Sequence, residues 1–124
     1  MPSAAAVVRI VWVVGYLIGT TTHVADIVHG GVNTYDGFPT ALRVFWLSLT
    51  VLDPLIVVLL LRRRRLGIVL GVVVILLDIA VNWTVYATIG GITLFGVVSQ
   101  SLFALFIVAT ARPLWGSFAG TKRA

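Results

Sequence analysis

Four long apolar stretches, separated by short polar breaks, dominate the pattern along this chain. The first break, HGGVNTYDGFPT, is rich in turn-forming residues, the second is a run of four arginines, and the third is the short link TIGGIT. About 20 apolar residues are enough for a helix to cross the ~30 Å hydrocarbon core of a bilayer. The pattern therefore predicts four transmembrane helices, at about 5–28, 40–61, 66–88 and 92–111, in one domain spanning 1–124.

Helical spacing places the polar and aromatic residues of each stretch on one face. In chain order these faces carry Trp12, Tyr16, Gly19, His23 and Asp26; Arg43, Trp46, Thr50 and Asp53; Gly71, Ile75, Asp78, Asn82 and Tyr86; and Thr93, Gly96, Gln100 and Phe103. Because lipid offers polar groups no partners, the four faces must meet one another. The sequence predicts an all-α integral-membrane bundle of four helices with an acidic, aromatic interior.

Three of the apolar stretches contain an aspartate, namely Asp26, Asp53 and Asp78. A charged side chain at the bilayer centre costs about 2.5–3.5 kcal/mol on insertion scales, so an intramembrane carboxyl marks a functional site by default. Asp53 and Asp78 are expected near the midplane, with no Lys or Arg at their depth. We expect at least one of them to be protonated at neutral pH and able to donate a proton. The alternative interpretation is a hydrogen-bonded pair that only joins helices.

Composition and charge place the chain in a membrane. It is 60% hydrophobic and only 10% charged, too apolar to cover the surface of a soluble domain. Seven of its nine Lys and Arg residues lie in the run 62–65 and, after the last apolar stretch, at Arg112, Lys122 and Arg123. The positive-inside rule then predicts that both termini are cytoplasmic. The Ala-, Val- and Arg-rich composition suggests a high-GC bacterium, so the expected location is a bacterial inner membrane. No soluble basic module is present to bind nucleic acid.

Several kinds of chemistry are disfavoured by the residues present. The chain has no cysteine, which excludes thiolate nucleophiles and iron–sulfur sites. His23, Asp26 and His29 resemble a metal-ligand cluster, but on a continuous helix His29 points away from His23. The aspartates also stand singly rather than in the clusters that hold Mg²⁺ on a prenyl diphosphate. We therefore expect no metal and no cofactor.

Protonation of an alkene fits the residues that remain. A buried acid donates a proton to a double bond, aromatic faces stabilise the resulting carbocation, and an Asn, Gln or His removes a proton at the end. The substrate would be apolar and could enter from the bilayer.

The four-helix layout, the Asp53-Pro54 pair, the Asp78-x-x-x-Asn82-Trp83 run and the small size resemble the small actinobacterial membrane terpene cyclases. Those enzymes cyclise prenylated indoles in indole-sesquiterpenoid pathways. A looser likeness is to the emopamil-binding family, four-helix sterol isomerases that protonate an alkene from a buried acid. The clustered DxDD motif of soluble proton-initiated cyclases is absent from this chain.

The resemblance implies specific roles. Asp78 or Asp53 would be the acid, with the other carboxyl and Asn82 tuning it, and His23 with Asp26 would be a second proton relay or the terminal base. The residues expected to bind substrate are Trp12, Tyr16, Trp46, Trp83, Tyr86, Gln100 and Phe103.

Two interpretations from other classes stay open. Intramembrane Asp and His residues also mark proton relays, so the chain could be a small proton-coupled transporter or channel subunit. It could also be an accessory subunit with structural aspartates. Acids on three helices and an aromatic interior favour chemistry over transport. The sequence leaves open the substrate, the choice between cyclisation and double-bond migration, and the oligomeric state.

Overall fold

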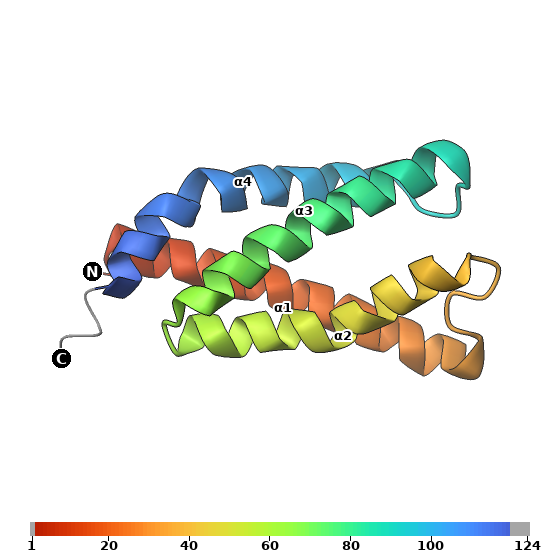
Figure 1. Cartoon of the computed structure of the whole chain (residues 1–124), viewed down its shortest axis with the longest axis horizontal. Coiled ribbons are helices and arrows are strands. Elements are labelled where there is room, and N and C mark those ends of the chain that lie inside the picture. The colour runs from red at the N-terminus through yellow and green to blue at the C-terminus, as the bar shows by residue number, and fades with distance from the viewer. Residues whose placement is uncertain (1, 120–124) are drawn as a thin grey trace.

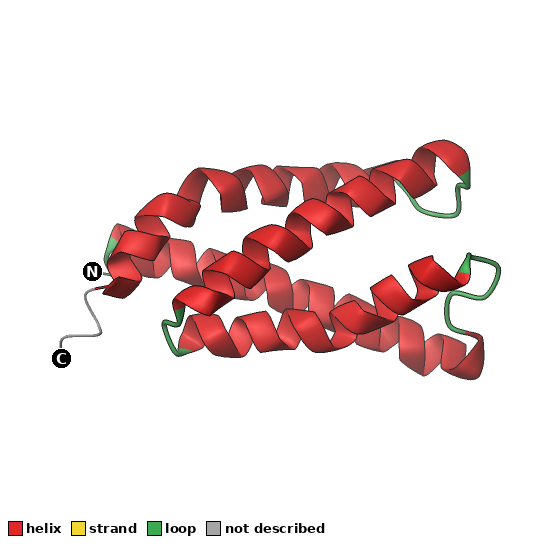
Figure 2. Cartoon of the chain, in the orientation of Figure 1, coloured by secondary structure: helices red, strands yellow, loops and turns green. Residues whose placement is uncertain are grey.

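The computed structural model describes residues 2–119, and within that range it is helical with no strand. The helices are α1 (Ala4–Gly30), α2 (Thr40–Leu61), α3 (Arg65–Thr88) and α4 (Leu94–Ala119), with a 3₁₀ turn η1 (Gly31–Asn33) after α1. Figure 2 shows the four helices joined by short loops. Each is long and apolar enough to cross a membrane. The predicted all-α chain with four membrane-length helices is confirmed.

The helix bounds differ from the predicted ones mainly in α4. This helix begins at Leu94 because the hydroxyl of Thr93 caps it, accepting the backbone N–H of Gly96 at 3.0 Å. It then continues through Pro113 to Ala119 rather than ending at 111. Proline removes only one backbone hydrogen bond, and Leu114 beyond it is fully buried, so packing maintains the helix. Lys122 and Arg123, used above for topology, lie outside the described residues.

The helices form two antiparallel hairpins, α1–α2 and α3–α4. In Figure 1 the hairpins lie close together where the termini and the α2–α3 connection meet, and they spread apart at the other end. We call the first the closed end. The second, which carries the loops at 31–39 and 89–93, is the loop end. Large side chains with almost no exposed surface fill the closed half, including Trp12, Leu60, Ile107, Leu114 and Phe118.

At the closed end two arginines donate hydrogen bonds to backbone carbonyls of α4. Arg63 donates to the carbonyl of Ser117 at 3.0 Å, and Nε of Arg65 donates to the carbonyl of Trp115 at 3.2 Å. The guanidinium of Arg65 also lies 4.6 Å from the ring centroid of Trp115. These contacts give hydrogen-bond partners to carbonyls in the last turns of α4, where a helix leaves its acceptors unpaired.

The loops at the loop end approach each other closely at Gly91. Gly91, in the loop before α4, has φ +84°, a left-handed conformation that favours glycine. A Cβ placed on it would lie 3.1 Å from Cζ of Phe38 in the other loop. Phe38 therefore packs directly against the Gly91 backbone.

Replacing Gly67 by alanine is expected to destabilise the protein. At this position α2 and α3 meet so closely that a Cβ would lie 2.8 Å from Cβ of Leu59 and 3.1 Å from the backbone nitrogen of Leu60. Because backbone atoms cannot move aside cheaply, we expect Gly67→Ala to lower the free energy of unfolding by about 1–3 kcal/mol. Thermal unfolding in detergent measures the effect.

Gly116→Ala on α4 is the matched control. No atom lies within 4 Å of a Cβ at that position, so the gain in helix propensity should leave the melting temperature unchanged or raise it. A Gly67→Ala protein as stable as the Gly116→Ala protein would contradict the close α2–α3 approach.

Candidate functional site

A cavity of about 890 Å³ lies between the four helices in the half nearer the loop end. All four helices and both loops contribute to its wall, and its volume falls within the ~300–1,000 Å³ typical of small-molecule sites. Nine of the side chains predicted to act on or bind a substrate line it: Tyr16, His23, Asp26, Trp46, Asp53, Asp78, Asn82, Gln100 and Phe103. The structure thus gathers residues from four separate stretches of sequence around one space.

Three of the side chains predicted to bind substrate lie outside the cavity lining. Trp12 is fully buried toward the closed end, where its indole N–H donates to Thr110 at 2.9 Å. Trp83 and Tyr86 are exposed on α3 and pack edge to face against each other. The indole N–H of Trp83 donates a hydrogen bond to the hydroxyl of Ser101 at 2.7 Å. These contacts give each tryptophan a structural partner of its own.

Asp78 is held by two side-chain amides. Its Oδ2 accepts from Nε2 of Gln100 at 2.6 Å, and its Oδ1 accepts from Nδ2 of Asn82 at 3.1 Å. Asn82 in turn donates to Oε1 of Gln100 at 3.0 Å and accepts the indole N–H of Trp46 at 3.0 Å. Donors on both oxygens favour the ionised carboxylate and offset part of the cost of burying it, so Asp78 is better suited to carry negative charge than a carboxyl without such donors.

Asp53 is equally buried but has no such support. Its carboxyl lies against α1, where a Cβ on Gly19 would come within 2.5 Å of Oδ2. Its ion-pair partner is His23, whose Nε2 is 3.9 Å from Oδ2, and no group among residues 2–119 donates a hydrogen bond to it. A carboxyl without donors in an apolar wall favours the neutral, protonated acid.

A chain of hydrogen bonds leads from His23 toward the loop end. Nδ1 of His23 lies 3.1 Å from the hydroxyl of Tyr35, and that hydroxyl donates to Oδ2 of Asp26 at 2.7 Å. Burial raises the pKa of the Tyr35 hydroxyl, and its hydrogen bond to Asp26 raises it further. Tyr35 therefore stays protonated at neutral pH. His29 is exposed and does not line the cavity.

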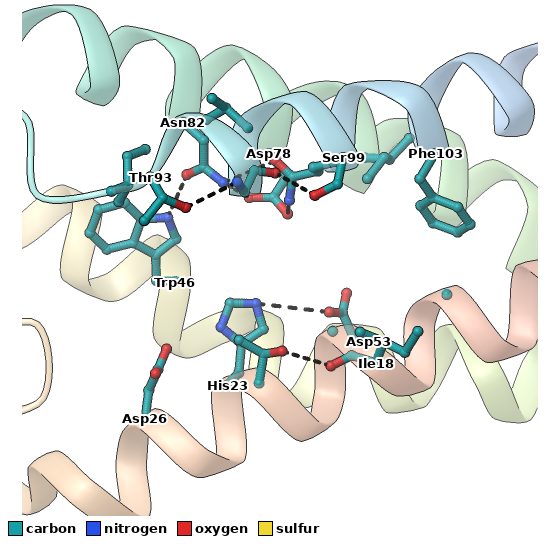
Figure 3. Close-up of a pocket in the computed structure, with 18 of the residues that line it drawn as sticks. Ile18, His23, Asp26, Trp46, Asp53, Asp78, Asn82, Thr93, Ser99 and Phe103 are labelled. Atoms are coloured by element: carbon teal, nitrogen blue, oxygen red, sulfur yellow. Dashed lines mark hydrogen bonds and ion pairs between the residues drawn. The ribbon is translucent and has the colours of Figure 1, made fainter.

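Figure 3 shows Asp78 and Asp53 on opposite walls of the cavity. Asp78, with Asn82 and Trp46 beside it, lies on one wall, and Asp53 and His23 face each other on the opposite wall. A molecule in the cavity would therefore sit between the two carboxyl groups.

The cavity is open at its side. Ile18 on α1 and Phe95 on α4 line it, yet they are 62% and 81% exposed. Thr22 and Ser99, from the same two helices, also line it and are exposed. We call the gap bordered by these four residues the side opening. Toward the closed end, in contrast, the bundle is filled by buried apolar side chains.

Comparison with known proteins gives no family. No family model, no curated protein and no solved structure matches this chain. Function is therefore argued from the chemistry of the site. Within residues 2–119 no group of three or more His, Asp or Glu side chains lies close enough to hold a metal ion.

Proposed function

We propose that this protein is an integral-membrane terpene cyclase that protonates an alkene or epoxide of a prenylated, indole-sesquiterpenoid-like substrate and closes a ring through a carbocation. The observation that carries the proposal is the contrast between the two acids on facing walls of one cavity. Asp78 accepts two amide hydrogen bonds, whereas Asp53 accepts none from the described residues. Environments that push two carboxyl groups apart in this way assign an acid and a charge stabiliser.

In this mechanism Asp53 is the general acid. Its proton goes to one carbon of the double bond, or to the epoxide oxygen, and the electron deficit moves to carbon. The carboxylate of Asp78 and the faces of Trp46, Tyr16 and Phe103 stabilise the cation while a second double bond attacks it. A neighbouring carbon then loses a proton to His23, which restores a neutral product.

The side opening supports an apolar substrate. With the helices across a bilayer, a gap between α1 and α4 faces the hydrocarbon, so a prenylated molecule could enter without crossing water. From the positive-inside rule we infer that the arginine-rich closed end and both termini are cytoplasmic and that the loop end is on the outer side, in what we propose is a bacterial inner membrane. The resemblance to small actinobacterial membrane cyclases points to the same substrate class.

A small proton-coupled transporter is the second candidate, because the hydrogen-bonded chain from Asp26 to His23 is of the kind that carries protons. Transport also needs a route to the other side. Between the cavity and the closed end the bundle is filled by fully buried side chains, including Trp12, Leu60 and Ile107. The filled closed half therefore favours chemistry in the cavity over transport through the bundle.

The proposal is tested with the protein in membranes made up in D₂O and supplied with a plain or epoxidised prenylated indole. We expect an isomeric product, and for the plain alkene that product gains one deuterium and loses one hydrogen. Mass spectrometry and NMR of the product detect both changes. If the folded protein converts no polyprenyl substrate but moves protons with a solute in liposomes, the transporter replaces the cyclase.

A further inference from the structure

We propose that the acid is reloaded through a proton relay, Asp26–Tyr35–His23–Asp53, which enters the cavity from the loop end. The relay adds a proton supply to the proposed function and rests on that function. Its central element is which ring nitrogen of His23 carries the proton, and this can be measured without any substrate. Tyr35 joins His23 to Asp26 in this relay. It lies in a loop, where helical periodicity gives no indication of a role.

The directions of the hydrogen bonds are fixed by counting protons. Tyr35 has one hydroxyl hydrogen, and the 2.7 Å contact to Asp26 uses it. In the 3.1 Å contact with His23 the tyrosine oxygen must therefore accept, and Nδ1 must carry the donated hydrogen. Neutral His23 then presents the lone pair of Nε2 toward Oδ2 of Asp53, at 3.9 Å. A shift of about 1 Å would bring that pair within hydrogen-bonding distance.

This arrangement corresponds to the loaded state of the relay. After Asp53 has given its proton to the substrate, Nε2 of His23 takes the proton that the carbocation loses. The Nδ1 proton then passes to Tyr35, and the hydroxyl proton of Tyr35 passes to Asp26. In the return, Asp26, which has exchanged its proton with water, protonates Tyr35, and Tyr35 protonates Nδ1. Rotation of the imidazolium ring by half a turn then presents this water-derived proton to Asp53, which accepts it, and leaves the substrate's proton on the nitrogen beside Tyr35. One proton leaves Asp53 and one returns, so the cycle balances.

The outer end of the relay reaches the surface. A second, shallower hollow of about 300 Å³ is lined by Asp26 and Tyr35 together with His29, Asn33 and Thr34, and the first two also line the main cavity. Asp26 can therefore exchange its proton with water at the loop end while Asp53 stays buried.

The backbone holds Tyr35 in an unusual conformation. Its φ is +60°, in the left-handed region that a bulky side chain rarely adopts. Its ring packs 5.1 Å from that of Trp46, between centroids. Strain of this kind persists where the surroundings require one geometry, and it is frequent at functional sites.

The first test is ¹⁵N NMR of histidine-labelled protein in lipid nanodiscs, without substrate. The chain has two histidines, so a His29→Gln protein leaves the signal of His23 alone. We expect neutral His23 to carry its proton on Nδ1 in this background and in the added Tyr86→Phe control. Adding Tyr35→Phe instead should shift the population toward the Nε2–H tautomer. A dominant Nε2–H form with Tyr35 intact would overturn the relay whatever the protein catalyses.

The second test follows the isotope during turnover in D₂O. Without Tyr35, Nε2 can still return the substrate's own proton to Asp53, but exchange with water through Asp26 is cut. The Tyr35→Phe protein should therefore form product with at least a several-fold lower deuterium content than wild type or Tyr86→Phe, even where product still forms. An unchanged deuterium content would contradict the relay. Absence of product in the wild type would instead contradict the cyclase and leave the NMR result standing.

Discussion

Asp53→Asn is expected to lower product formation by about 10²–10⁴-fold, the range that a positioned general acid contributes. The amide has nearly the same shape as the carboxyl but cannot protonate an alkene. Since no described group donates a hydrogen bond to Asp53, little structural support is lost. The measurement is the initial rate of product formation in membranes, with circular dichroism and thermal unfolding of the purified variant to show that the fold is kept.

Asp36→Asn is the matched control for this loss. Asp36 is the one carboxyl side chain of the sequence besides Asp26, Asp53 and Asp78. It is exposed in the 31–39 loop and does not line the cavity. Its replacement makes the same change from carboxyl to amide and should leave the rate near that of wild type. A wild-type rate in Asp53→Asn would show that Asp53 is not the general acid. Wild-type rates in both Asp53→Asn and Asp78→Asn would contradict the proposed cyclase mechanism.

Asp78→Asn is expected to act through charge, with a loss of about 10²–10³-fold, comparable with the removal of one electrostatic stabiliser of a transition state. It should also cost about 1–3 kcal/mol of folding free energy, because the new NH₂ group faces an amide donor of Asn82 or Gln100. Rates and melting temperatures of the variant measure the two effects separately.

A double variant separates charge from shape at this site. In Asp78→Asn/Gln100→Glu the amide of residue 78 can donate to a carboxylate at position 100, which restores an amide–carboxylate pair and the negative charge. We expect the melting temperature to recover and the rate to rise at least about tenfold over the single variant, a fraction of the electrostatic term. Recovery of stability without any recovery of rate would show that Asp78 itself, rather than the charge, is required.

The sequence predicted the four helices well because a bilayer sets their length and apolar content. It was least accurate where side chains outside the periodic pattern decide the structure. The cap at Thr93 delays the start of α4, and the buried Leu114 carries the helix past Pro113. Neither feature can be read from hydropathy alone.

The prediction of the candidate site succeeded and failed for similar reasons. Asp53, Asp78 and Asn82 were predicted to point inward, and they do, because their spacing matches a helical face and lipid offers them no partners. Trp12 follows the same stripe, yet it lies about three turns from His23 along α1, beyond the end of the cavity. Periodicity fixes a direction around a helix but does not fix where along the axis a cavity ends.

Tyr35 could not be predicted in this way. It lies between η1 and α2 with a left-handed backbone, so its direction depends on the loop rather than on a helix. The only available signal was an aromatic residue within a turn-rich segment.

The contact between Phe38 and Gly91 has an evolutionary consequence. Position 91 is nearly closed to change, since its φ of +84° disfavours any side chain and the phenyl ring of Phe38 lies 3.1 Å from where a Cβ would be. Position 38 has no such backbone restriction, and both residues line the cavity. Descendants of this protein that come to accept bulkier molecules should therefore carry smaller residues at 38 while keeping glycine at 91. A single codon would then be enough to shift the range of accepted molecules without redesigning the acids.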